Sequence, residues 1–74
     1  MPEYSILIQY DKNDNIYIAS IPELSGCMAH GNTQEDAVKE IKIALELQIE
    51  ELISSGAEIP QPILFAGLQP FPAT

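Results

Sequence analysis

The chain has 74 residues, with eleven carboxylates and three lysines, and its formal net charge is −8. This charge argues against direct binding to nucleic acid, because phosphate contacts need Lys and Arg. Its single cysteine excludes an intramolecular disulfide framework and favours a reducing compartment. No apolar run approaches the ~20 residues that span a bilayer, and the N-terminus lacks a basic and apolar leader, so we expect a cytoplasmic protein with no membrane partner.

Three strands are predicted in the first part of the chain. Residues 3–10 alternate between two faces and are rich in β-branched and aromatic side chains, which indicates a strand. The polar residues 11–15 predict a hairpin turn, and 16–21 the returning strand, which Pro22 ends because it has no backbone donor. Residues 27–30 are long enough for a third strand. Consecutive strands with short links predict an antiparallel meander.

One long helix is predicted over residues 34–55. Thr33 and Asp36 form a Thr-x-x-Asp capping box at its start, and Gly56 is placed to end it as a left-handed cap. Apolar residues recur between these limits at helical spacing, so one stripe of the helix should face the sheet. The predicted fold class is therefore α+β, with the order β-β-β-α and the helix packed on one face of the sheet.

The C-terminal segment, residues 57–74, intersperses prolines among apolar residues and cannot be a helix. We expect an extended tail that is a candidate for a short strand. The whole chain, 1–74, is predicted to be one domain with its core at about 3–56 and with no C-terminal DNA-binding domain.

Self-association is predicted from size and geometry. A chain this short buries only about 60% of its unfolded surface, and such domains usually need a staple or a partner. A helix of about 33 Å overhangs three strands that span ~14 Å, and it covers only one sheet face. The other face carries Leu7 with either Tyr17 and Ile21 or Ile16 and Ile18. We expect a homo-oligomer, a dimer or tetramer, with contacts from Leu7, Ile49, Leu52, Ile53, Ile63, Leu64 and Phe65.

The run over residues 21–36 has the sequence Ile-Pro-Glu-Leu-Ser-Gly-Cys-Met-Ala-His-Gly-Asn-Thr-Gln-Glu-Asp. It resembles the signature of the HicB-like antitoxin family, in which a strand ends in Pro-Glu-Leu-Pro-Gly-Cys, a short strand leads to Gly-Asp-Thr, and a helix opens with an acidic residue and Ala. Ser25 stands where the family usually has Pro, and Asn32 where it usually has Asp. The matching residues are Pro22, Glu23, Leu24, Gly26, Cys27, Gly31, Thr33, Glu35, Ala37 and Ala44.

This resemblance implies a core described as a partial, degraded ribonuclease H-like fold. For paired members it implies binding to a small basic toxin of HicA type, which has a double-stranded-RNA-binding-like fold and cleaves mRNA with a histidine. The resemblance further implies that the antitoxin would occlude that surface. Many members continue into a helix-turn-helix or ribbon-helix-helix domain, which the proline-rich tail cannot form, so operator binding by this chain is not expected.

The exposed face of the predicted helix is the candidate contact for such a toxin, since an acidic surface suits a basic partner. A solvated helix face with no partner is the alternative interpretation of the same pattern. The candidate residues are Glu40, Glu46, Glu50 and Glu51.

Two other functions stay open at this point. One is a stand-alone oligomeric domain that binds a small ligand at a subunit interface. The other is a vestigial nuclease, which needs several carboxylates converging on paired metal ions. Cys27 is more simply a small packed side chain than a nucleophile, and the lone His30 is weak evidence for a metal ligand. We expect no enzyme activity, no catalytic residue, no metal and no cofactor.

Overall fold

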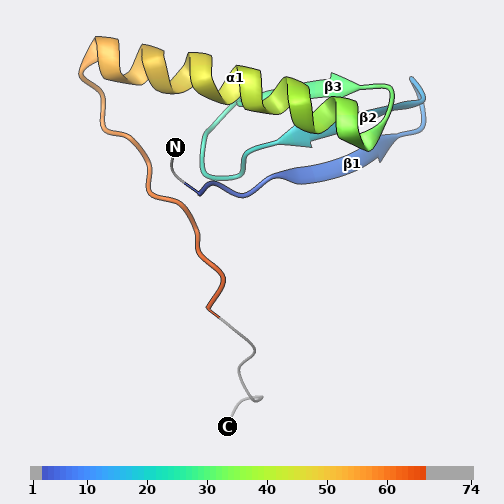
Figure 1. Ribbon diagram of the computed structural model, residues 1–74, viewed down its shortest axis with the longest axis horizontal. Coiled ribbons are helices and arrows are strands. Elements are labelled where there is room, and N and C mark those ends of the chain that lie inside the picture. The colour runs from blue at the N-terminus through green and yellow to red at the C-terminus, as the bar shows by residue number, and fades with distance from the viewer. Residues whose placement is uncertain (1–2, 67–74) are drawn as a thin grey trace, which may run out of the picture.

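The computed structural model describes residues 3–66 and has the expected α+β architecture (Figure 1). Three antiparallel strands, β1 (Leu7–Asp11), β2 (Ile16–Ser20) and β3 (Met28–Gly31), form one sheet in the order β1-β2-β3. A single helix, α1 (Gln34–Ser55), follows and lies along one face of this sheet. The predicted β-β-β-α order is confirmed.

The first strand is shorter than predicted. It begins at Leu7, which pairs with Ser20 at the end of β2, so the prediction of a strand from residue 3 was wrong. Ahead of β1 the chain is held by a side chain instead of a strand partner. The backbone N–H of Ser5 donates to both carboxylate oxygens of Glu23, at 3.2 and 3.1 Å. The other two predicted strands agree with β2 and β3 to within one residue at each end.

The register of the sheet decides which side chains face the helix. Ile8, Ala19 and Ala29 lie opposite one another across the three strands and therefore share a face. Ala19 is fully buried on that face, and Ile41 of α1, which is also fully buried, belongs to the same core cluster. The core cluster consists of Ala19, Ile21, Leu24, Cys27, Ala37, Ile41 and Leu45.

The opposite face of the sheet has no layer over it in the described part of the chain. Because Leu7 pairs with Ser20 and side chains alternate along β2, Ile16 and Ile18 lie on this open face with Leu7. Tyr17 and Ile21 lie on the helix face and pack with the core. The register thus selects one of the two arrangements that the sequence allowed.

Both predicted helix limits are confirmed. Thr33 has an extended backbone, and its Oγ1 accepts the N–H of Asp36 at 3.1 Å. Gly56 adopts a left-handed conformation with φ of 74°, and its N–H donates to the carbonyl of Ile53. Within residues 3–66 no helix combines the length and the apolar character needed to cross a membrane.

After the helix, residues 57–66 are extended but form no strand, and the rest of the predicted tail lies outside the described residues. The tail leaves the end of α1 and passes the N-terminal segment on the β1 side of the sheet (Figure 1). The Tyr4 hydroxyl donates to the carbonyl of Pro60, and the N–H of Ile63 donates to Glu23 at 2.8 Å.

Candidate functional site

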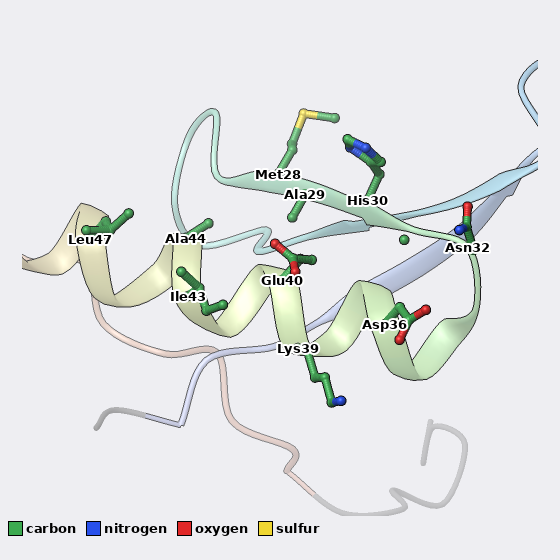
Figure 2. Close-up of a pocket in the computed structure, with 11 residues that line it drawn as sticks. Met28, Ala29, His30, Asn32, Asp36, Lys39, Glu40, Ile43, Ala44 and Leu47 are labelled. Atoms are coloured by element: carbon green, nitrogen blue, oxygen red, sulfur yellow. The ribbon is translucent and has the colours of Figure 1, made fainter.

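A furrow runs between the outer edge of β3 and the neighbouring side of α1 (Figure 2). Its volume is about 630 Å³, and it is open to solvent along its length. We call it the β3–α1 furrow. Its lining consists of Met28, Ala29, His30, Gly31 and Asn32 on the strand side and Asp36, Lys39, Glu40, Ile43, Ala44 and Leu47 on the helix side.

Helical and strand periodicity explain this lining. Glu40, Ala44 and Leu47 lie on the same side of α1 because residues three and four apart are neighbours on a helix. On the strand, Ala29 points toward the helix, whereas Met28 and His30 project from the other side (Figure 2). The alternation along β3 thus leaves a small side chain under the helix.

The β3–α1 furrow combines exposed apolar side chains with acidic ones. Ile43 is 52% exposed and Leu47 59%, so the two form an apolar strip on the helix side of the furrow, while Met28, 61% exposed, lies at the strand border. Glu40 lies between the helix and β3, while Lys39 points away from the strand (Figure 2). A strip of this kind with a charged border is typical of a protein contact surface.

The acidic border continues beyond the furrow. A second hollow begins at Leu47 and is lined by Glu50, Glu51, Ser54 and Ser55 near the end of α1. Three of the four candidate carboxylates therefore border the two hollows that meet at Leu47: Glu40 the first, and Glu50 and Glu51 the second. Glu46, the fourth, is exposed on α1 but borders neither hollow.

The seven residues predicted to contact a second subunit fall into two groups, one half-buried within the chain and one exposed to solvent. Ile49 and Leu52 are half-buried and pack against the core of their own chain. The other five are exposed: Leu7 on the open sheet face, Ile53 near the end of α1, and Ile63, Leu64 and Phe65 on the tail.

Glu23 joins three segments that are far apart in the sequence. Besides the backbone N–H of Ser5, its carboxylate accepts the Ser5 hydroxyl at 2.9 Å and the N–H of Ile63 at 2.8 Å. The hydrogen bond from Ile63 holds the pKa of this carboxyl below its usual range, with further contributions from Ser5. Glu23 belongs to the family signature, but this role was not predictable from the sequence because its partners are 18 and 40 residues away.

Acidification should therefore weaken the attachment of the tail. The pKa of Glu23 is lower in the folded state than in the unfolded state, so its contribution to stability is present above the unfolded pKa and is lost as the pH falls through the folded pKa. We expect Glu23→Gln to lower the Tm at neutral pH and to flatten its decline in acid. Thermal unfolding followed by circular dichroism between neutral and acidic pH measures both effects. Glu46→Gln, a matched change on the exposed helix, should keep the wild-type profile.

Cys27 packs in the core, as predicted, and burial raises the pKa of its thiol, which opposes formation of a thiolate. His30 is exposed, with its side chain directed away from α1 (Figure 2). Among residues 3–66 no three His, Cys, Asp or Glu side chains are grouped so that they could hold a metal ion.

The strand order, the capped helix and the acidic furrow define the chain as a small acidic α+β domain of the β-β-β-α type. The sequence model of the HicB-like antitoxins of bacterial toxin–antitoxin systems matches residues 4–73. The chain belongs to this HicB-like antitoxin family.

Relatives from distant organisms support this membership. A UPF0150 protein of Thermoplasma acidophilum is 34% identical over 59 residues, which are 80% of this chain and 84% of the relative. A UPF0150 protein of Synechocystis is 38% identical over 58 residues, 78% of this chain and 72% of the relative. A second one from Synechocystis is 33% identical over 67 residues, 90% and 88% of the two chains. No solved structure shows a significant match.

The family signature serves mainly the fold. Leu24 and Cys27 are buried, Thr33 caps the helix, and Gly31 lies against its first turn. Family membership supports an antitoxin role for the chain.

Proposed function

We propose that this chain is a non-catalytic antitoxin that binds a small basic toxin of HicA type directly and so neutralises it in the cytoplasm. The observation that carries the proposal is the group of exposed carboxylates Glu40, Glu50 and Glu51, which line the two hollows that meet at Leu47, together with the exposed apolar side chains of Ile43 and Leu47 on α1. Family membership and the net charge of −8 support it.

The two parts of this surface have different physical tasks. A toxin that cleaves mRNA needs a positive surface for phosphates, and the carboxylates of α1 attract the same surface. Charge of this kind mainly raises the rate of encounter and selects the partner. The apolar side chains then contribute the desolvated centre on which most binding energy depends. In this proposal the chain contacts protein and not nucleic acid, and the carboxylate of Glu46, which is exposed on α1 outside both hollows, adds to the negative potential.

Charge reversal on the helix should weaken toxin binding. We expect Glu50→Lys with Glu51→Lys to reduce affinity by about tenfold or more, because both carboxylates face the partner's positive surface. The remaining affinity should depend less on salt than that of the wild type. Calorimetric titration with a small basic toxin of HicA type, at several salt concentrations, measures both quantities.

Asp14→Lys with Glu58→Lys is the matched control, since it makes the same change in net charge on a turn and on the tail. If this pair weakens binding as much as the helix pair, attraction is unspecific and the proposed surface is wrong. If no small basic protein of the same organism co-purifies with the chain, and co-expression of the chain rescues cells from no HicA-type toxin of that organism, the antitoxin proposal itself fails.

A further inference from the structure

The C-terminal end of α1 extends beyond the sheet (Figure 1). The strand β3 has 4 residues and spans about 13 Å, whereas the 22 residues of α1 span about 33 Å. The β3–α1 furrow ends at Leu47 on the helix side, and the second hollow, which Glu50 and Glu51 line, is formed by helix residues alone. Two of the carboxylates in the proposed toxin contact therefore lie where no strand supports the helix.

The loop between β2 and β3, residues 21–27, contacts this end of the helix instead. We call it the β2–β3 loop. Three backbone hydrogen bonds of 3.0 to 3.3 Å close the loop on itself. Leu24 in the loop is 3% exposed and belongs to the core cluster against which Ile49 and Leu52 of α1 pack. The β2–β3 loop is thus a firm support for the part of α1 that the sheet does not reach.

One polar contact joins the β2–β3 loop to the end of α1. The side-chain Nε2 of Gln48 donates to the carbonyl of Ser25 at 3.3 Å. Within residues 3–66 it is the only side-chain hydrogen bond from α1 to another part of the fold beyond the helix cap. Because Gln48 lies two and three residues before Glu50 and Glu51, this contact fixes the helix at the turn that carries them.

The local sequence gives this end of the helix little stability of its own. Glu50 and Glu51 lie near the negative end of the helix dipole, and the last turn has no basic side chain to offset them. Ile53, Ser54 and Ser55 have weaker helix propensity than Ala or Leu. A short helical segment of this kind is marginal without tertiary packing. Its order therefore depends on the β2–β3 loop and on the cap at its end.

We infer that Gln48 is a positioning residue for the proposed toxin contact: its hydrogen bond to the β2–β3 loop holds the end of α1 so that Glu50 and Glu51 face the partner. The inference rests on the proposed function. A helix end that is fixed before the partner arrives avoids the entropy cost of ordering it on binding. Glu40 lies beside β3 and needs no such support, so Gln48 should act on one part of the contact only.

Hydrogen exchange of the full chain tests the support of the helix end without a partner. Gln48→Met keeps the length of the side chain and removes the donor, and Gln34→Met makes the same change at an exposed residue at the start of α1. The amides of residues 52–55 donate to carbonyls within the supported turn. We expect them to exchange about two- to tenfold faster in Gln48→Met and at the wild-type rate in Gln34→Met. Amides of residues 41–45 should be unchanged in both variants.

Calorimetric titration with a HicA-type toxin tests the consequence for binding. Gln48→Met should weaken binding by about two- to tenfold, and Gln34→Met should leave it unchanged. In a double-mutant cycle the effect of Gln48→Met should largely vanish when Glu50→Lys and Glu51→Lys are present, since Gln48 acts through those carboxylates. The effect should remain in full beside Glu40→Lys. A residue that only stabilised the fold would produce the same loss in both backgrounds.

Wild-type exchange rates at residues 52–55 in Gln48→Met would overturn the inference. A loss of affinity of equal size in the Glu40→Lys background and in the background with Glu50→Lys and Glu51→Lys would contradict it as well. If the wild type binds toxin and Gln48→Met binds it equally tightly, this inference fails and the antitoxin proposal stands. If the wild type binds no such toxin, the antitoxin proposal fails and the role of Gln48 in binding fails with it, whatever the exchange rates show.

Discussion

Replacing Ile41 with alanine should remove about 2–5 kcal/mol of folding stability. Ile41 is fully buried at the centre of the helix stripe that faces the sheet, so the change removes apolar contacts and leaves a cavity. Single domains have only about 5–15 kcal/mol in total, and a chain of this size lies toward the low end. We therefore expect a large unfolded population at room temperature. Urea unfolding followed by circular dichroism measures the loss.

The matched control is Ile43→Ala, the same change two residues away on the same helix. Ile43 is 52% exposed and lines the β3–α1 furrow instead of the core, so its loss should cost well under half as much. Equal losses at the two positions would mean that α1 does not bury the stripe seen here. The control also bears on function, because Ile43→Ala should weaken binding in the furrow while the fold remains.

Replacing Gly31 with alanine should cost at least about 1–3 kcal/mol, since the added carbon has nowhere to go. It would lie 2.4 Å from the backbone nitrogen of Ala37 and 2.7 Å from backbone and side-chain carbons of Asp36. These are mostly backbone atoms in the first turn of α1, so the helix has to move off β3. Thermal unfolding of the variant gives the size of the effect.

Gly26→Ala is the control that distinguishes a steric clash with α1 from the strain of a left-handed backbone. Gly26 has a φ of 78° and open space around it, so alanine there costs only the strain of a left-handed backbone, about 1–2 kcal/mol. Gly31 has no such φ, and its cost comes from the contact with α1. A Gly31→Ala protein as stable as the wild type would contradict the close approach of β3 to the helix. Because Gly31 also lines the β3–α1 furrow, its replacement should impair binding there as well.

The helix was predictable to the residue because its signals are local. The Thr33 cap reaches only to Asp36, and Gly56 ends the helix through its own backbone conformation. The strands β2 and β3 were predictable to within one residue for a similar reason, since turns and Pro22 limit them directly. The family signature was informative for the same reason, because its residues form turns, the Thr33 cap of the helix and the close contact of Gly31 with α1.

The start of β1 was not predictable from alternation, because residues 3–6 have a strand pattern but pair with no strand among residues 3–66. Their polar partner is Glu23, whose role depends on Ser5 and Ile63 meeting at one carboxylate. Such contacts depend on the folded path of the chain and leave no periodic pattern. The same holds for the β3–α1 furrow, which requires the register of β3 and the rotation of α1 together.

The sequence by itself determined the order of the elements, the limits of the helix, the acidic charge and the family, since each depends on neighbouring residues or on composition. Only the tertiary structure decided that Ile16 and Ile18 lie on the open face, that Glu23 holds the tail, and that Glu40, Glu50 and Glu51 border the two hollows that meet at Leu47. The physical reason is that register and helix rotation are set by packing of the whole core, which brings together residues that no local pattern connects.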